Sequence, residues 1–304
     1  MIKIINAKEP VQQKYCNTDL CVMRKIFLFG NHSNCHCGSK AVWQTLKDYL
    51  VKNKYFIVDS LDEADMVIIN GEGSMHHNSR DCRIKLNMIE TVASLGKNIS
   101  LINTVWQDNS ASNVGDRLKY ISKIVTREVM SCKDLEKNHN IYSTVAPDIA
   151  CFALNDSEKK EISNAKESSL HKNVAITDLY SHEFKCWVQL QGRFKQRYKM
   201  HILNKYQWFE LIKSFAASKA VITGRHHAIC ACLLAKTPFV PIKSNSHKIE
   251  GLLLSANANI PIASTANQIE NILSEVLEGT YNHEYEKCYQ WLDSFTINDA
   301  IPLP

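Results

Sequence analysis

The sequence has little glycine, few prolines, no internal repeat and no low-complexity tract. Of 304 residues, 10 are glycine and 7 are proline, while 45% are hydrophobic and 22% are charged. This composition is ordinary for a soluble globular protein and excludes a disordered chain, a collagen-like repeat and a coiled-coil rod. The length predicts two domains, each large enough to bury a core.

The sequence also lacks a strong excess of charge of one sign. The formal net charge is +5 and the sequence pI is about 8.5. No stretch alternates basic residues with aromatic residues over a length that would bind a nucleic-acid strand, so we expect no nucleic-acid partner. The mild positive charge suits a small anionic substrate, or peripheral association with an anionic membrane surface.

Long hydrophobic runs are missing too. The longest, Ala228–Ala235, is far shorter than the roughly 20 residues that span a bilayer. The segment Met1–Met23 lacks the apolar core of a signal peptide. The 11 cysteines are odd in number and irregularly spaced, so we expect free thiols in a reducing cytoplasm. Cys230 and Cys232 lie in an apolar helical segment and are expected to be core thiols.

Short apolar runs alternate with helical patterns along most of the chain. Expected strands are 25–30, 55–60, 65–71, 98–106, 123–127, 143–148, 173–178, 220–224 and 238–242. Expected helices are 39–52, 80–95, 131–139, 206–218, 227–236, 266–277 and 285–294. The polar stretch Asn155–Lys172 is expected to interrupt the pattern, and an irregular region follows Asp178 as far as Asn204.

This alternation predicts an α/β protein with two doubly wound, Rossmann-like lobes and a cleft between them. We expect an N-terminal arm at residues 1–24 and an acceptor-side lobe at 25–160. A donor-side lobe, ending in closing C-terminal helices, is expected at 161–304. Ligands of such sheets lie beyond the carboxyl ends of the strands, so polar residues at strand–helix junctions are the candidates for a site.

The sharpest candidate in the second lobe is Gly224-Arg225-His226-His227, which follows an expected strand and opens an apolar helix. A helix N-terminus favours anions, an arginine can bind phosphate or carboxylate in a fork, and a histidine can donate or move a proton. The alternative interpretation is a cluster that only caps the helix. Lys248 follows the next strand and could project its ammonium toward the same anion.

In the first lobe, Asn70-Gly71-Glu72-Gly73 and then His76 follow an expected strand. Two glycines around one acid suggest a tight turn near a ligand, in which Glu72 or His76 could act as a base for a hydroxyl, although a plain turn is the alternative. Arg127-Glu128 ends another strand, a placement that also fits a surface salt bridge.

The loop from Gly30 to Gly38 contains two histidines and two cysteines. Its spacing matches no structural zinc pattern, so we expect no metal site. The better interpretation is a polar loop lining an acceptor site, which makes Asn31 and His32 candidates.

Taken together, these motifs resemble the polysaccharide pyruvyl transferase family from about Lys25 to Leu254. The segments that carry the resemblance are Gly224-Arg225-His226-His227-Ala228, Ala235-Lys236-Thr237-Pro238, Lys248-Ile249-Glu250-Gly251, Asn70-Gly71-Glu72-Gly73, Thr126-Arg127-Glu128 with Ser131, and Pro147-Asp148. Glu72 stands where the family more often has a third glycine. The family's glycine-acid pair in the first loop is missing, and Gly38-Ser39-Lys40 stands near its place.

The resemblance implies a GT-B-like fold and a transferase of surface-glycan biosynthesis, such as that of capsule or lipopolysaccharide. The implied donor is phosphoenolpyruvate, a co-substrate rather than a cofactor, and the implied acceptor is a sugar, free or lipid-linked, that becomes a pyruvate ketal. The alternatives are a glycosyltransferase with a nucleotide-sugar donor and a glycan-binding protein without turnover. The expected cellular location is the cytoplasm, including the inner face of the membrane.

The candidate residues fall into three groups. Catalytic roles are assigned to His227, Arg225 and Glu72. Donor or anion binding is assigned to Arg127, Arg225, His226, His227 and Lys248. Acceptor binding is assigned to Asn31, His32, Gly71, Gly73, His76 and Asp148.

Overall fold

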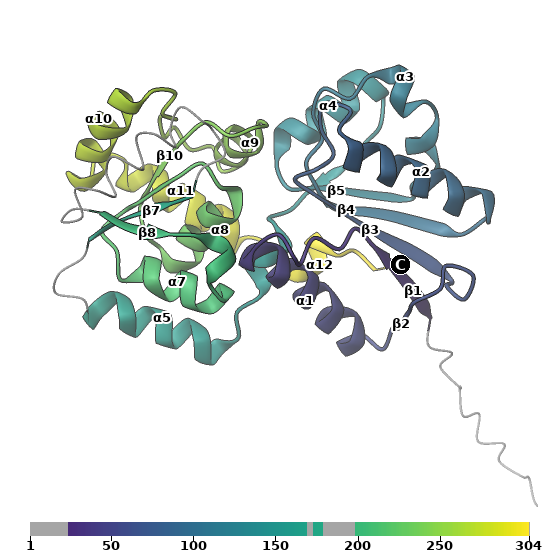
Figure 1. Cartoon of the computed structure of the whole chain (residues 1–304), viewed down its shortest axis with the longest axis horizontal. Helices are drawn as coiled ribbons and strands as arrows, with labels where there is room; N and C mark the ends of the chain where they lie inside the picture. Colours follow the sequence, from purple (N-terminus) through teal and green to yellow (C-terminus); the bar gives the residue numbers. More distant parts are fainter. Residues whose placement is uncertain (1–23, 169–172, 179–197, 304) are drawn as a thin grey trace, which may run out of the picture.

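The computed structural model describes residues 24–168, 173–178 and 198–303. The expected N-terminal arm and most of the expected irregular region before Asn204 lie outside these residues. The described chain forms two α/β lobes that lie side by side, with α1 at their junction (Figure 1).

The first lobe is built on a six-stranded sheet in which every pair of neighbouring strands is parallel, in the order β2-β1-β3-β4-β5-β6. Its central strands β3 and β4 are almost entirely buried, as expected of a parallel sheet covered on both faces. The strands are β1 (Lys25–Phe29), β2 (Phe56–Val58), β3 (Met66–Glu72), β4 (Asn98–Thr104), β5 (Lys123–Thr126) and β6 (Thr144–Val145). The helices are α1 (Cys37–Lys52), α2 (Arg80–Ser94), α3 (Ala111–Val114), η1 (Arg117–Tyr120) and α4 (Val129–His139), with η2 (Ile149–Phe152) leading to the second lobe.

The second lobe is built on a four-stranded parallel sheet in the order β10-β9-β7-β8. Its strands are β7 (Val174–Thr177), β8 (Tyr198–His201), β9 (Val221–Thr223) and β10 (Phe239–Pro241). Its helices are α5 (Asp156–Ser168), η3 (Leu203–Lys205), α7 (Trp208–Ala216), α8 (His226–Ala235), α9 (Lys248–Ser255), α10 (Ala266–Leu277), α11 (Asn282–Asp293) and α12 (Ile297–Ala300).

The two sheets repeat one winding scheme. In each lobe the first strand in sequence (β1 or β7) lies between the second and the third, so the direction of winding reverses beside it. The carboxyl ends of strands at such a reversal form a natural crevice for a ligand. The predicted fold class, an α/β protein with two doubly wound, Rossmann-like lobes, is therefore confirmed.

The expectation for Asn155–Lys172 was wrong, because most of this stretch forms the helix α5. Its sequence is rich in Lys, Glu and Ser, and Ile162 is its one fully buried apolar residue among those described, so hydrophobic periodicity gives a weak signal. Helix α5 packs against α7 and α8. The expected division between residues 160 and 161 falls inside this helix.

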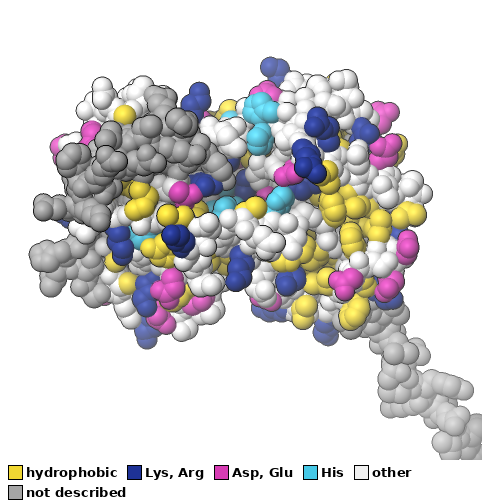
Figure 2. Space-filling model, in the orientation of Figure 1, with side chains coloured by type: hydrophobic (Ala, Val, Ile, Leu, Met, Phe, Trp, Pro, Cys, Tyr) yellow, Lys and Arg dark blue, Asp and Glu magenta, His cyan; other side chains and the backbone are white. Residues whose placement is uncertain are grey.

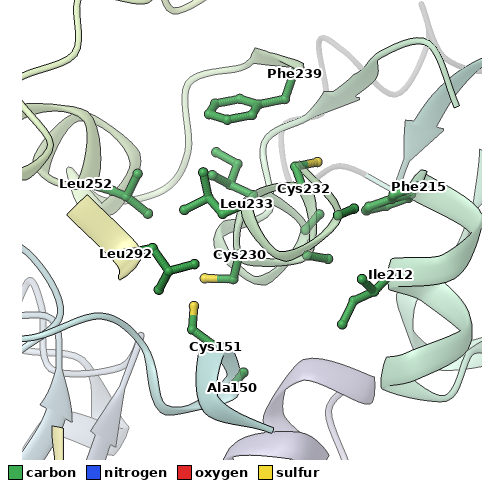
Figure 3. Close-up of a cluster of buried hydrophobic side chains, with 14 of the residues drawn as sticks. Ala150, Cys151, Ile212, Phe215, Cys230, Cys232, Leu233, Phe239, Leu252 and Leu292 are labelled. Carbon is green, nitrogen blue, oxygen red and sulfur yellow. The ribbon is translucent and has the colours of Figure 1, made fainter. Parts of the chain in front are cut away.

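Helix α8 is buried along almost its whole length. All of its residues except Leu234 are buried, and its apolar side chains pack among α7, β10, α9 and α11 (Figure 3). As expected, Cys230 and Cys232 are core thiols, and the sulfur of Cys230 faces that of Cys151 in η2 (Figure 3). The cysteines in the described part of the chain are free.

The same hydrophobic core continues from the second lobe into the first. Leu46 of α1 and Ile26 of β1 belong to one buried cluster with Phe215 of α7 and Ile229 of α8. Near the C-terminus the chain returns to the first lobe, where Asn298 accepts a hydrogen bond from the Tyr49 hydroxyl at 2.6 Å. None of the helices in the described ranges is both long and apolar enough to cross a bilayer.

Candidate active site

The loops after β1, β3, β5, β9 and β10 converge on one cavity of about 160 Å³ between the lobes. Histidine and basic side chains gather along the same seam (Figure 2). The cavity is lined by His32, Cys35, His36, Ser39, Glu72, Gly73, Ser74, Asp81, Arg127, His226, His227, Asn245 and Lys248. The structure thus brings together seven of the predicted residues, namely His32, Glu72, Gly73, Arg127, His226, His227 and Lys248.

A buried ion pair lies at the base of this cavity. Arg127, at the end of β5, donates from Nη1 to Oδ2 of Asp148 over 2.5 Å, and both side chains are almost fully buried. Asp148 also caps η2 by accepting from the Ala150 amide at 2.9 Å. A buried charge is tolerated only when it is paired, so this carboxylate fixes the arginine in place.

The N-terminus of α8 brings two histidines to the same carboxylate. Nε2 of His226 and Nε2 of His227 each lie 3.5 Å from Oδ2 of Asp148. Burial alone would raise the pKa of Asp148, but the charges of His227 and Arg127 outweigh burial and hold that pKa well below its usual range. Asp148, which does not itself line the cavity, therefore stays ionised and orients Arg127 and the two histidines.

Lys248 begins α9 and supplies a further cation from the second lobe. Its side chain is buried, and its ammonium donates to Oδ1 of Asn245. Burial, followed by the charges of Arg127 and Arg225, lowers the pKa of Lys248 to about 7. Such a lowered pKa means that the charged form of the lysine is destabilised in the unliganded protein. A bound anion would stabilise the charged form, so a lysine of this kind is typical of an anion site.

Arg225 is the N-cap residue of α8 and does not line the cavity directly. Its guanidinium pairs with the carboxylate of Asp178, and its Nε donates to the Asp178 carbonyl oxygen at 3.3 Å. Asp178 follows β7, so the pair joins the two strand ends at the winding reversal of the second lobe. The arginine also acts through space on the cavity, since its charge is among the causes that lower the pKa of Lys248.

The ring of His227 is positioned by close packing. It meets the ring of His36 edge-on at a centroid distance of 4.8 Å, and Trp208 lies beyond it at 6.3 Å. Gly38 packs directly against it, because a Cβ atom at Gly38 would lie 2.5 Å from Cγ of His227. Burial, with the neighbouring His227 and Arg225, lowers the pKa of His36 to about 3, so His36 is neutral.

Glu72, from the first lobe, lines the same cavity as Arg127 and Lys248. Its backbone has a φ of 44°, in the left-handed region that glycine occupies at little cost, so a non-glycine residue here carries strain. Oε2 accepts from the Ser39 hydroxyl at 3.0 Å, whereas Oε1 is buried and has no hydrogen-bond partner among the described residues. The turn thus holds a carboxylate oxygen at the cavity with its bonding capacity unused.

The two glycines beside Glu72 lie where the backbone comes close to neighbouring side chains. A Cβ atom at Gly71 would overlap the side chain of Thr104 in β4, and one at Gly73 would lie 3.2 Å from Nη2 of Arg127. Gly73 therefore lets the turn approach the buried guanidinium. Gly71 lies beneath the cavity rather than at its surface.

Two predicted acceptor residues lie away from the cavity wall. Asn31 is exposed and accepts from the Ser33 amide at 2.9 Å, which shapes its own loop. His76 lies with Nδ1 at 2.8 Å from Nδ1 of His77. Burial, followed by the charge of Lys248, lowers the pKa of His76 to about 4.

Sequence reasoning missed several residues of the site: His36, Ser39, Asp81, Asn245 and, just below the surface, Lys85. Lys85 left a readable signal, because it lies three residues after Cys82 and four before Ile89, on the buried face of α2. Asn245 left none, since it lies in a loop whose position depends on the packing of both lobes.

Beside the cavity, the start of α4 holds the two lobes together. Glu128 is the N-cap residue of α4, accepts from the Ser131 amide, and lies 3.3 Å from Nε2 of His247 in the second lobe. Ser255 of α9 accepts from the Val129 amide at 2.9 Å. The Arg-Glu-x-x-Ser segment therefore has a divided structural role, with its arginine at the cavity and its glutamate and serine at the lobe contact.

The described residues contain no group of three or more His, Cys, Asp and Glu side chains arranged to hold a metal ion. The chemically distinctive feature is instead a set of arginine, lysine and histidine side chains from both lobes, in a cavity that the carboxylates of Glu72 and Asp81 also line. Side chains of these types, gathered between two lobes, are chemically suited to bind a small anion.

Comparison with known proteins identifies the family. A sequence model of the polysaccharide pyruvyl transferase family matches residues 39–246, so this chain belongs to that family and is a transferase. The family implies pyruvyl transfer in glycan biosynthesis, from a pyruvyl donor to a sugar acceptor. A comparison with curated proteins found no significant match.

Solved structures share the fold at low sequence identity. The functionally uncharacterized protein KP1_0663 from Klebsiella pneumoniae is 12% identical, with a TM-score of 0.54, over 80% of this chain and 93% of that one. MurG from Acinetobacter baumannii is 9% identical, with a TM-score of 0.47, over 91% of this chain and 97% of that one. At these identities the likeness to KP1_0663 supports the fold alone.

Proposed function

We propose that the protein transfers a pyruvyl group from phosphoenolpyruvate to a pair of sugar hydroxyls and forms a pyruvate ketal. The observation that carries this proposal is the set of arginine, histidine and lysine side chains, Arg127, His226, His227 and Lys248, around one small cavity that Glu72 and Asp81 also line. Phosphoenolpyruvate carries a phosphate and a carboxylate, which arginine, lysine and histidine side chains recognise well.

The cavity volume favours a small donor. At about 160 Å³ it is below the roughly 300–1,000 Å³ that is usual for drug-sized ligands. A nucleotide sugar, with a base, a ribose, a pyrophosphate and a hexose, needs far more room. The volume therefore fits a donor of the size of phosphoenolpyruvate.

The reaction balances in atoms and protons. Protonation of the methylene carbon of phosphoenolpyruvate generates an oxocarbenium-like centre, to which the oxygen of one sugar hydroxyl bonds as it loses its proton. The bond to phosphate then breaks, and the neighbouring hydroxyl closes the ketal. Of the two hydroxyl protons, one replaces the proton given to carbon and the other leaves with inorganic phosphate.

We assign the proton-transfer roles from these contacts. We assign His227 to the donor phosphate and as the candidate proton donor to carbon, since its ring lines the cavity and lies beside Asp148. Glu72, His76 and Asp148 are the side chains that could accept the proton of the sugar hydroxyl. Asp148 is committed to Arg127, and His76 lies outside the cavity lining. Glu72 is the remaining one, and its Oε1 is unpartnered among the described residues.

The experiment measures phosphate release from phosphoenolpyruvate in the presence of methyl glycosides of glucose, galactose and mannose. Mass spectrometry of the product should show glycoside plus pyruvate minus one water. In parallel, thermal shift compares phosphoenolpyruvate with nucleotide sugars, because a ligand at about 100 times its Kd stabilises the fold by ~2.7 kcal/mol. Stabilisation and glycosyl transfer with a nucleotide sugar would overturn the proposal.

Arg225→Ala tests the role of the second lobe. We expect turnover to be lost and donor binding to weaken, with the melting temperature little changed, because Arg225 lies at a partly exposed helix start. Lys236→Ala, at the other end of the same helix, is the matched control and should behave as wild type. Near-wild-type activity and donor affinity in Arg225→Ala would remove this residue from the site.

A further inference from the structure

Lys85 is a buried lysine with no assigned role. It lies on α2, is 2% exposed, and is not itself part of the cavity lining. Its stem packs beside Gly30, where a Cβ atom would lie 3.2 Å from Cε of Lys85 and would also overlap the Asn70 carbonyl oxygen. Gly30 has a φ of +88°, so only glycine fits this place without strain.

The ammonium of Lys85 connects the two loops that form the first-lobe half of the cavity. Nζ donates to the Gly71 carbonyl oxygen at 2.7 Å and to the Ser74 hydroxyl at 2.5 Å, on both sides of Glu72. It also lies 2.9 Å from Nε2 of His32, in the loop after β1. The three N–H groups of this buried ammonium thus have three acceptors: a carbonyl oxygen, a hydroxyl oxygen and an imidazole nitrogen.

In the contact between Lys85 and His32, the donor and the acceptor can be assigned. An ammonium has no lone pair, so Nε2 of His32 must accept, and the single ring hydrogen of the neutral imidazole must be on Nδ1. Burial, followed by the charge of Lys85, lowers the pKa of His32, which keeps the ring neutral. The ionisable groups around the ammonium are His32 on the first loop, Glu72 on the turn, Asp81 and Cys82 on α2, and Arg127 directly after β5.

We propose that Lys85 is a positioning residue of the acceptor half of the site. It fixes His32 as a neutral Nδ1–H donor toward sugar hydroxyl oxygens and holds the turn that presents Glu72. This inference rests on the proposed function for its substrate, but the state of the His32 ring is a property of the unliganded protein.

The direct test is the tautomer of His32, read from ¹⁵N–¹H correlation spectra of the wild-type protein at pH 7 and assigned with His32→Gln. We expect the neutral Nδ1–H form in wild type and its loss in Lys85→Met. A protonated ring or the Nε2–H form in wild type overturns the proposal, whether or not the protein turns over phosphoenolpyruvate.

The kinetic test separates positioning from stability. Lys85→Met should lower kcat/KM for the methyl glycoside that serves as acceptor at least tenfold, while the KM for phosphoenolpyruvate changes less than twofold. Lys97→Met is the matched control, because Lys97 also donates to two carbonyl oxygens, those of Asp62 and Ala64, far from the cavity. Equal losses in both variants, or equal effects on donor and acceptor, would reduce Lys85 to a structural lysine.

Failure of this inference and failure of the proposed function are distinguishable. Wild-type protein that binds no phosphoenolpyruvate removes the proposed function but leaves the His32 spectrum as a valid test. Active wild type with an unchanged acceptor kcat/KM in Lys85→Met removes the positioning role alone.

Discussion

Gly38, at the start of α1, lies directly against the imidazole of His227, at the start of α8. A Cβ atom at Gly38 would lie 2.5 Å from Cγ of His227, closer than real Cβ atoms approach other atoms. The glycine of the first lobe therefore sets the position of a histidine of the second.

Replacing this glycine should displace the histidine. We expect Gly38→Ala to lower kcat/KM at least tenfold, about 1.4 kcal/mol of transition-state stabilisation, because the ring must leave its place above Asp148. Steady-state kinetics with phosphoenolpyruvate measure the effect. Lys40→Ala, two residues further along α1 and exposed, is the control, and equal activity of the two variants would show that the contact has no catalytic weight.

Substitutions of Arg127 separate the contribution of its positive charge from that of its planar guanidinium. Arg127→Lys keeps the charge but loses the planar fork, so we expect at least a tenfold loss of kcat/KM, about 1.4 kcal/mol. Arg127→Ala leaves Asp148 buried without its partner and should cost about 3–5 kcal/mol of folding stability, measured by denaturant unfolding. Arg117→Lys, at the partly exposed pair with Glu90, should change stability by no more than ~1 kcal/mol. Wild-type kinetics and stability in both Arg127 variants would contradict the assignment.

Donor binding should be coupled to protonation of Lys248. The pKa of this lysine is lowered to about 7 in the unliganded protein, so at pH 8 most of it is neutral, and an anion beside it favours the charged form. We expect proton uptake on binding phosphoenolpyruvate at pH 8 and little uptake at pH 6, where the lysine is already charged. Calorimetry in buffers of different ionisation enthalpy measures this, and Lys248→Met should abolish the difference.

The same lysine affects stability with a defined sign. Its folded-state pKa lies below its unfolded value, so between about pH 7 and pH 10 the unfolded chain binds more protons and this lysine makes stability rise with pH. Lys248→Met removes that contribution. The stability gained by wild type relative to the variant between pH 7 and pH 10, from denaturant unfolding, should therefore be positive; a flat difference would contradict it.

Transfer activity should not depend on a divalent metal. The arginine and lysine side chains at the cavity can balance the charge of the donor, and the two histidines at the start of α8 lie beside Asp148 rather than around a shared ion. We expect equal rates before and after treatment with EDTA. Loss of activity in EDTA, restored by zinc or magnesium, would show that the protein side chains do not suffice.

The sequence was most informative where one strand or helix determines the outcome. The junction Gly224–His227 and the turn Asn70–Gly73 were predicted as site segments because each follows an apolar strand. The strain at Glu72 also has a sequence trace, since the family more often has glycine at the position that here adopts a φ of 44°.

Contacts between elements could not be predicted from the sequence in this way. The pairing of Arg225 with Asp178 depends on the sheet order that places β9 beside β7. His36 could be recognised as a site residue only from the structure, because it lines the cavity through the packing of α1 against α8, where its ring contacts that of His227. Helix α5 was missed because its exposed face is polar, and its packing on α7 leaves little hydrophobic periodicity.

The two lobes share core residues along α1, so neither can lose its packing alone. Leu46 is fully buried in the cluster that also holds Phe215 and Ile229, and Trp208 donates to the Ala150 carbonyl oxygen at 3.1 Å across the same junction. Independent domains melt separately, whereas domains with a common core unfold in one cooperative transition. Heat should therefore unfold this protein in a single step, and any widening of the cleft to admit a sugar must pivot about α1 rather than separate the lobes.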